Sequence, residues 1–161
     1  MRDLIVGNIP PNSLRTGVYV TIVIAVTFII FLVYRLRRNH YIGTRWVRQM
    51  YLAADTLGLA SFTVTGAGIG MYNYPDMPVL SVILGLLTAV GGGVIRDVLA
   101  QRVPSVLREE VYALPAIIGG IVYCMFYYAG QWQMASYSSF LIVVIIRTLA
   151  IRYNWSLPRI K

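Results

Sequence analysis

Three consecutive glycines followed by an arginine and an aspartate are the residues of this sequence whose types and spacing best suit chemistry. They form the stretch GGGVIRD, which contains Gly91, Gly92, Gly93, Arg96 and Asp97 and lies in an apolar segment of residues 79–100. Each glycine costs about 1 kcal/mol relative to alanine inside a helix, so the triplet predicts a break in the helix. In a bilayer, such a break persists only where protein buries it or where it lines a wet cavity. Because charges at membrane depth are costly and commonly functional, the stretch predicts a transport pathway.

A helix broken at the glycines would have two inner ends of opposite polarity. The first half-helix, ending near Val90, would present carbonyl oxygens that suit a cation. The second, beginning near Val94, would present free amides that suit an anion, with Arg96 close by. A cation would use the first end, with Arg96 acting as a gate or neutralised by Asp97 or Asp55, whereas a zwitterionic amino acid would use both ends. A close helix crossing at the glycines, with both charges in the headgroup layer, is the third interpretation.

The composition is that of an integral membrane protein. Of the 161 residues, 58% are hydrophobic and 12% are charged, whereas a soluble domain carries about a quarter charged residues. The formal net charge is +8, and the arginines gather between apolar runs, which is the positive-inside pattern rather than a nucleic-acid surface. The sequence offers no histidine–cysteine cluster, no paired intramembrane carboxylates and no nucleophile with a base at readable spacing. We therefore expect neither an enzyme nor a cofactor or metal site.

Five apolar runs near the length of a membrane span set the predicted topology. They cover residues 17–36, 51–72, 79–100, 111–129 and 137–153. Arginine and lysine residues gather in the segments after the first and third runs and in the C-terminal tail, which predicts that these segments are cytoplasmic. After the first run, Arg35, Arg37 and Arg38 are candidates for binding anionic lipid headgroups, although any positive-inside loop has a similar composition.

Small residues in the second and fourth runs predict close helix packing, because they let neighbouring backbones approach. Those of the second run are Gly66, Gly68 and Gly70, and those of the fourth are Gly119 and Gly120. Pro115 is expected to kink the fourth helix together with its glycine pair.

Three polar side chains in these runs have both a functional and a structural interpretation. Asp55, one turn inside the second run, either lines the pathway or only caps its helix or pairs with Arg45 or Arg48. Thr88, near the glycine triplet, is a packing residue or a pore hydroxyl. Arg147, in the cytoplasmic half of the last run, either snorkels to the membrane surface or contributes to packing or gating.

An internal repeat organises the chain. Residues 1–19 align with residues 95–112, each copy running from Arg-Asp through a proline and a leucine to a tyrosine that precedes an apolar run. The copies fall on opposite sides of the membrane, so they predict inverted repeats. The predicted organisation is the end of a first repeat with a basic loop (1–50), a complete three-helix second repeat (51–129), and a final span with its tail (130–161). It implies that five of seven spans are present and that two precede Met1.

Several motifs occur here in the order in which a known channel family carries them. The stretches DTLGLASFTVTGAGIG, GLLTAVGGGVIRDVL and VYALPAIIGG lie within residues 55–120. They resemble the second repeat of the prokaryotic trimeric intracellular cation (TRIC) channels, and related bacterial proteins carry a glycine-transporter label. Residues 1–36 resemble the end of the first repeat of that family, and the last apolar run resembles its seventh helix.

The resemblance implies an all-α membrane protein with two inverted three-helix repeats plus a final helix. It also implies a homotrimer in a bacterial or archaeal plasma membrane, in which each protomer passes monovalent cations, mainly potassium, through its own pore. Gly91, Gly92 and Gly93 would lie beside that pore. The alternative is a secondary transporter of a small amino acid such as glycine, and a structural or lipid-binding membrane protein is the third possibility.

Overall fold

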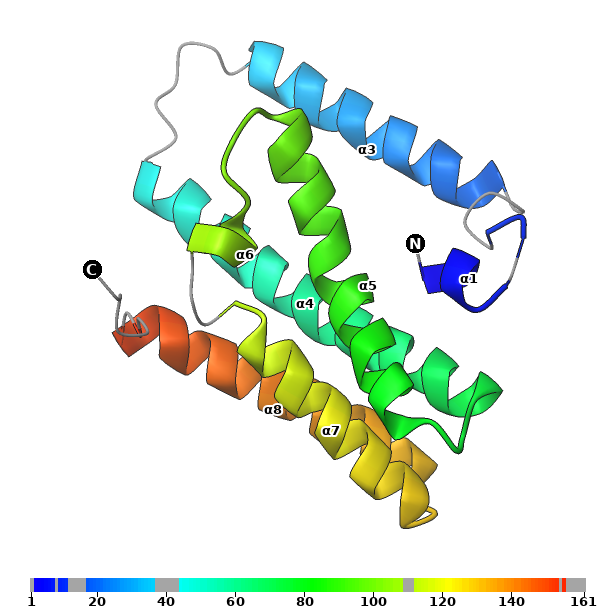
Figure 1. Cartoon of the computed structure of the whole chain (residues 1–161). Coiled ribbons are helices and arrows are strands. Elements are labelled where there is room, and N and C mark those ends of the chain that lie inside the picture. The colour runs from blue at the N-terminus through cyan, green and yellow to red at the C-terminus, as the bar shows by residue number, and fades with distance from the viewer. Residues whose placement is uncertain are drawn as a thin grey trace. The chain divides into compact units, whose positions relative to one another are not determined.

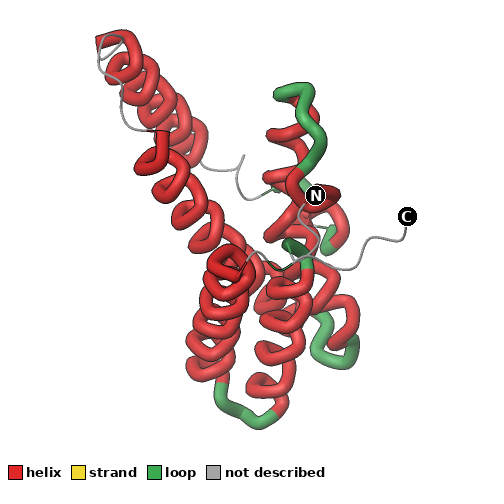
Figure 2. Tube along the Cα trace, turned by 90° about the vertical axis from the view of Figure 1, so that its left-hand side faces the viewer, coloured by secondary structure: helices red, strands yellow, loops and turns green. Residues whose placement is uncertain are grey.

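The chain is built entirely from helices in the parts that its computed structural model describes. These parts are residues 2–7, 9–11, 17–36, 44–108, 112–153 and 155. Every regular element among them is a helix (Figures 1 and 2), as the sequence predicted. Contacts divide the chain into a larger unit, residues 1–2 and 53–161, and a smaller unit, residues 3–52. The residues of interest lie in the larger unit.

Each predicted apolar run overlaps a helix. The helices are α1 (Arg2–Ile5), α3 (Gly17–Leu36), α4 (Thr44–Asn73), α5 (Pro78–Leu99), α6 (Ser105–Arg108), α7 (Leu114–Tyr128) and α8 (Trp132–Tyr153). By length and hydropathy, three described segments are able to cross a membrane, namely Val47–Asn73, Pro78–Leu99 and Trp132–Tyr153, and two shorter apolar helices, Gly17–Val33 and Leu114–Tyr128, accompany them.

Several boundaries differ from those predicted. Helix α4 begins at Thr44, so the end of the expected basic loop is helical. Helix α8 begins at Trp132 rather than near Tyr137. Pro115 lies in the first turn of α7, where a proline sacrifices no helical hydrogen bond, because first-turn amides have no intrahelical acceptor. This proline therefore starts the helix and does not kink it.

The predicted break at the glycine triplet is wrong. Helix α5 continues from Pro78 through Gly91, Gly92 and Gly93 to Leu99. Three glycines cost roughly 3 kcal/mol of helix propensity in total, but each backbone group left unsatisfied in a bilayer costs several kcal/mol. Keeping the hydrogen-bond ladder is therefore the cheaper arrangement. Since no half-helix ends here, the triplet does not supply the exposed carbonyls or amides that the sequence suggested.

Glycines bring α4 and α5 into backbone contact in the larger unit. A β-carbon placed on Gly66 would lie 2.5 Å from the carbonyl oxygen of Leu84. One placed on Gly70 would lie 2.5 Å from the Cα atom of Ser81. No side chain larger than hydrogen fits at either position without moving the facing helix, so these two glycines set the distance between α4 and α5.

Helix α7 uses its glycine pair against two neighbours. The Ser139 hydroxyl of α8 donates a hydrogen bond to the Gly119 carbonyl oxygen at 2.8 Å, and both residues are buried. On the other side, a β-carbon on Gly120 would lie 3.3 Å from the Cα atom of Val82 in α5. The pair thus lets α7 pack closely between α5 and α8.

A buried cluster joins the ends of α4 and α7. Ala67 and Met71 of α4 and Cys124 of α7 are among its buried members. The hydroxyl of Tyr123 lies 2.9 Å from where a β-carbon of Gly68 would stand. Together with the contacts above, this packing holds α4, α5, α7 and α8 in one arrangement. It fixes the relative positions of the charged side chains that these helices carry, including Asp55, Arg96 and Arg147.

Substituting Gly66 should distinguish a packing glycine from an open one. Gly66→Ala should lower the free energy of unfolding by about 2 kcal/mol, because overpacking a tight contact carries this kind of cost. Gly92→Ala is the matched control, since a β-carbon there meets nothing within 4 Å and alanine favours the helix by about 1 kcal/mol. Denaturation in detergent micelles measures both. Equal stability of the two variants would contradict the packing role.

Candidate functional site

Arg96 and Asp97 form an ion pair at the C-terminal end of α5. The Nε and Nη2 atoms of Arg96 each lie 2.9 Å from the same carboxylate oxygen, Oδ1 of Asp97. The Arg96 side chain is 43% exposed, whereas that of Asp97 is 10% exposed. The aspartate is thus anchored in the protein, and the arginine extends from it toward the surface.

Asp55 of α4 is the point at which three other elements meet. The Tyr112 hydroxyl, just before α7, donates a hydrogen bond to its Oδ1 atom at 3.1 Å. The Nη1 atom of Arg96 lies 3.9 Å from the same oxygen, and the Nη2 atom of Arg147 lies 3.8 Å from Oδ2. The Asp55 side chain is only 13% exposed, so its charge is balanced mainly by protein groups.

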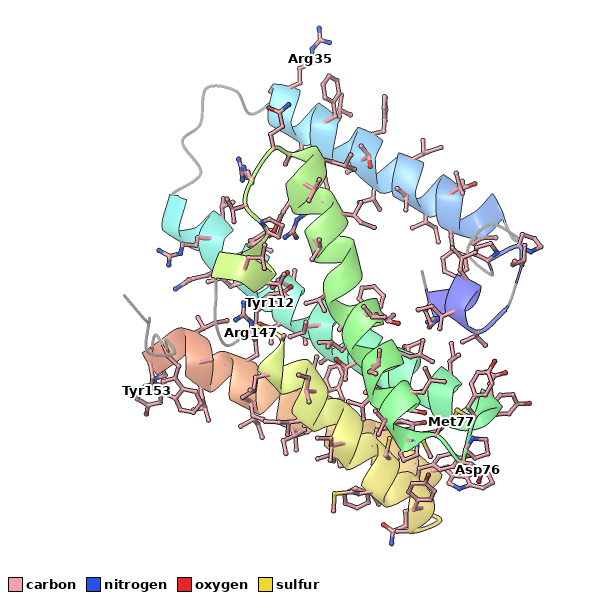
Figure 3. The ribbon with its side chains drawn as sticks, in the orientation of Figure 1. Arg35, Asp76, Met77, Tyr112, Arg147 and Tyr153 are labelled. Atoms are coloured by element: carbon pink, nitrogen blue, oxygen red, sulfur yellow. The ribbon has the colours of Figure 1, made fainter. Side chains whose placement is uncertain are left out.

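Arg147 of α8 is the most enclosed charge of the group. Its side chain is 4% exposed, and its guanidinium carbon lies 4.5 Å from the centroid of the Tyr112 ring. Figure 3 shows the two labelled side chains close together, where the chain leads into α7 beside α8. A cation over an aromatic face in a desolvated place gains about 2 kcal/mol, so Tyr112 stabilises Arg147 as well as Asp55.

The five side chains together form what we call the charge cluster, namely Asp55, Arg96, Asp97, Tyr112 and Arg147. Its two carboxylates and two guanidinium groups have a formal charge of zero. The sequence identified Asp55, Arg96 and Asp97 as candidates, and the structure brings these three together. It pairs Asp55 with Arg96 and Arg147, not with Arg48 on its own helix, and the side chain of Arg45 lies outside the described residues.

Tyr112 and Arg147 were not among the predicted site residues. Tyr112 stood out only as the tyrosine that ends the internal repeat, whereas Arg147 was considered for packing or gating, but without a predicted partner. A buried arginine in a membrane span needs a partner of opposite charge. This requirement was the only signal in the sequence that pointed to Arg147, and it did not indicate which acidic residue would be its partner.

The face of α5 that carries Arg96 also carries the middle glycine of the triplet. Thr88, Gly92 and Arg96 are spaced four residues apart, which places them on one face of the helix. A β-carbon on Gly92 would meet nothing within 4 Å, and Gly92 is exposed. Gly93 faces the cluster instead, because its β-carbon would lie 3.6 Å from the Tyr112 hydroxyl. Gly91 is half-buried.

Thr88 is already engaged in the helix contact. Its hydroxyl donates to the Leu84 carbonyl oxygen at 2.6 Å, and it lies 2.8 Å from where a β-carbon of Gly66 would stand. Of the predicted lipid-contact residues, Arg35 is exposed at the end of α3 (Figure 3), and Arg37 and Arg38 lie outside the described residues. In the part of the chain that the structure describes, no group of histidine, cysteine, aspartate and glutamate side chains suits a metal ion.

Known proteins resemble this chain in sequence and in fold. A family model described as "Glycine transporter" matches residues 52–128. The UPF0126 inner membrane protein YadS of Escherichia coli (strain K12) is 40% identical over 117 residues, covering 71% of this chain and 56% of that protein. The UPF0126 membrane protein YvgT of Bacillus subtilis (strain 168) is 32% identical over 160 residues, covering 98% of this chain and 74% of that protein. The chain thus spans about half the length of the E. coli relative.

Solved structures show the same fold. One, from work on the structural basis for conductance through TRIC cation channels, has a TM-score of 0.84 at 37% identity and covers 99% of this chain and 75% of that chain. The TRIC trimeric intracellular cation channel orthologue from Rhodobacter sphaeroides has a TM-score of 0.83 at 26% identity, covering 96% of this chain and 76% of that chain. On this evidence of sequence and fold, the chain is a multi-pass membrane protein that belongs to the TRIC/UPF0126 family.

Proposed function

We propose that the protein is a cation channel that conducts potassium along the exposed face of α5. The observation that carries this proposal is the likeness of fold to TRIC cation channels, with a TM-score of 0.84 over 99% of the chain. The geometry of α5 supports the placement, because Gly92 leaves open space on the same face as the exposed Arg96. A residue without a side chain lets an ion or its water approach the helix closely.

In this proposal the charge cluster sits at one end of the pathway and limits what passes. Arg96 presents the exposed positive charge. It lies 2.9 Å from Asp97 but 3.9 Å from Asp55, so its guanidinium can move away from Asp55 while it stays paired with Asp97. An arginine that moves between such positions alters both the width and the electrostatic barrier of a narrow conduit. Arg96 is therefore the proposed gating residue, with Asp97 as its anchor.

The second candidate is a secondary transporter of a small amino acid such as glycine. The description of the matching family model favours it, and so does the presence of both charge signs within the charge cluster. A zwitterion would place its carboxylate near Arg96 and its ammonium near Asp97. The continuity of α5 weakens this alternative, because the helix ends that were expected to bind both groups of the amino acid are not formed.

The remaining parts of the proposal concern assembly and surroundings. We propose a homotrimer with a pore in each protomer, since the R. sphaeroides neighbour is described as a trimeric channel. The protein would lie in the plasma membrane with its C-terminus in the cytoplasm, an orientation that the distribution of bases favours. Arg35, Arg37 and Arg38 would then face anionic headgroups of the inner leaflet.

The test of conduction is potassium flux into proteoliposomes, with labelled glycine uptake measured in parallel. We expect potassium flux that saturates weakly, and no glycine uptake. Gly92→Leu should reduce the flux at least tenfold, because a branched side chain would fill the open face, while the smaller Gly92→Ala should retain most of it. Saturable glycine uptake without potassium flux would overturn the channel and establish the transporter. Potassium flux that is unchanged in Gly92→Leu would place the pathway elsewhere.

A further inference from the structure

The position of Arg147 resembles that of a bound cation more than that of an ordinary structural arginine. Its guanidinium lies 3.8 Å from Asp55 Oδ2 and 4.5 Å from the centroid of the Tyr112 ring. A carboxylate oxygen and an aromatic face are both groups that hold monovalent cations. Arg147 approaches this pair of groups from α8, a helix that contributes none of the residues on the predicted pathway.

An intramembrane carboxylate without such a partner would be a trap for permeating cations. The attraction between a carboxylate and a cation grows as water is excluded, and Asp55 is only 13% exposed. Conduction requires that an ion bind well enough to enter and weakly enough to leave. A channel with Asp55 beside its pathway therefore needs a means of keeping this carboxylate occupied.

We propose that Arg147 is a tethered counter-cation that occupies the cation site formed by Asp55 and Tyr112 and so prevents potassium from being retained there. This proposal rests on the proposed channel function and deepens it by assigning the residue that sets the affinity of the pathway. The covalent tether gives the guanidinium a permanent advantage over a free ion, since its local concentration does not depend on the bulk solution.

Tyr112 is the positioning residue for this arrangement. Its hydroxyl donates to Oδ1 of Asp55 at 3.1 Å while its ring face lies beneath the guanidinium of Arg147. The hydrogen bond holds Oδ1, which leaves Oδ2 directed to Arg147 at 3.8 Å. The two cations of the cluster are thereby separated, with Arg147 on Oδ2 and the exposed Arg96 nearer Oδ1 at 3.9 Å.

The experiment replaces Arg147 with neutral side chains and measures potassium affinity in two ways. Potassium flux into proteoliposomes gives the concentration at half saturation, and the melting temperature of the detergent-solubilised protein is compared in potassium chloride and in the chloride of a large organic cation. In Arg147→Gln, we expect half saturation at a concentration at least fivefold lower and a potassium-dependent rise in melting temperature that the unmodified protein lacks. Arg147→Met, which retains the length of the aliphatic stem, replaces the glutamine variant if that variant does not fold.

Two further variants separate a counter-cation from a packing residue. Arg147→Lys keeps the charge and should therefore keep the potassium affinity of the unmodified protein. If Arg147 were needed only for its shape, lysine would change the affinity as glutamine does. Asp55→Asn combined with Arg147→Gln removes the carboxylate as well and should abolish the potassium-dependent rise in melting temperature. Half saturation and melting behaviour that are both unchanged in Arg147→Gln would overturn the proposal.

The outcomes also distinguish this proposal from the proposed function. If the unmodified protein carries no potassium flux, the channel function fails, and the melting temperature of Arg147→Gln alone decides whether Arg147 occupies a cation site. If the unmodified protein carries flux but neither property changes in Arg147→Gln, the channel stands and the tethered counter-cation is rejected.

Discussion

Asp55→Asn should lower the free energy of unfolding by about 3 kcal/mol, because breaking a buried ion pair by removing one partner costs this much. The asparagine keeps an oxygen that accepts the hydrogen bond from Tyr112, so the loss isolates the charge rather than the contact. Asp55 attracts the enclosed Arg147 at 3.8 Å and Arg96 at 3.9 Å. Equilibrium denaturation in detergent micelles measures the change, and retention of helix signal at low denaturant shows that the variant is folded.

Asp76→Asn provides the matched control for that result. Asp76 lies exposed in the turn between α4 and α5 (Figure 3), where removing a charge should change stability by less than about 0.5 kcal/mol. If both substitutions had the same small effect, the charge cluster would not be a source of stability. The ion pairs of Asp55 would then be surface contacts of little consequence.

The sequence was sufficient to predict which segments form helices. Apolar runs of membrane length, interrupted by bases and turn residues, correspond to α3, α4, α5, α7 and α8. It was not sufficient for the state of the glycine triplet. Helix propensity is measured in water, where a freed amide finds another partner, whereas α5 keeps its hydrogen bonds because the bilayer offers none. The same physical fact that suggested a functional break thus argues for a continuous helix.

Three of the five residues of the charge cluster, Asp55, Arg96 and Asp97, were predicted from sequence patterns. Arg96 and Asp97 are adjacent, so their pairing could be proposed without a structure. The hydrogen bond from Tyr112 to Asp55 joins residues 57 positions apart, and that proximity depends on how closely α4, α5 and α7 pack. Glycines set this packing, including Gly66 and Gly120. Their presence predicted close contact between helices, but not which side chains of these helices would meet in the charge cluster.

Arg96→Gln is the substitution expected to raise conduction most. At low ionic strength we expect potassium flux to rise roughly tenfold, since fixed charges at a conduit change the local ion concentration by such factors. The rise should shrink in concentrated salt, because the Arg96 side chain is 43% exposed and exposed charges are screened within about 10 Å at 0.1 M. Flux measured across a series of ionic strengths checks both the direction and the screening.

The two arginines of the charge cluster should differ in their effect on conduction, because one is exposed and the other is enclosed. Removing the exposed Arg96 should raise the rate of ion entry with little change in half-saturating potassium, because the glutamine can still donate a hydrogen bond to Asp97 and Arg147 remains beside Asp55. Removing Arg147, only 4% exposed, should instead lower half-saturating potassium and depend weakly on salt. Arg96→Lys, which keeps the charge, should behave like the unmodified protein. A loss of potassium flux in Arg96→Gln would contradict an electrostatic barrier, and a loss of glycine uptake would identify Arg96 as the group that binds a substrate carboxylate.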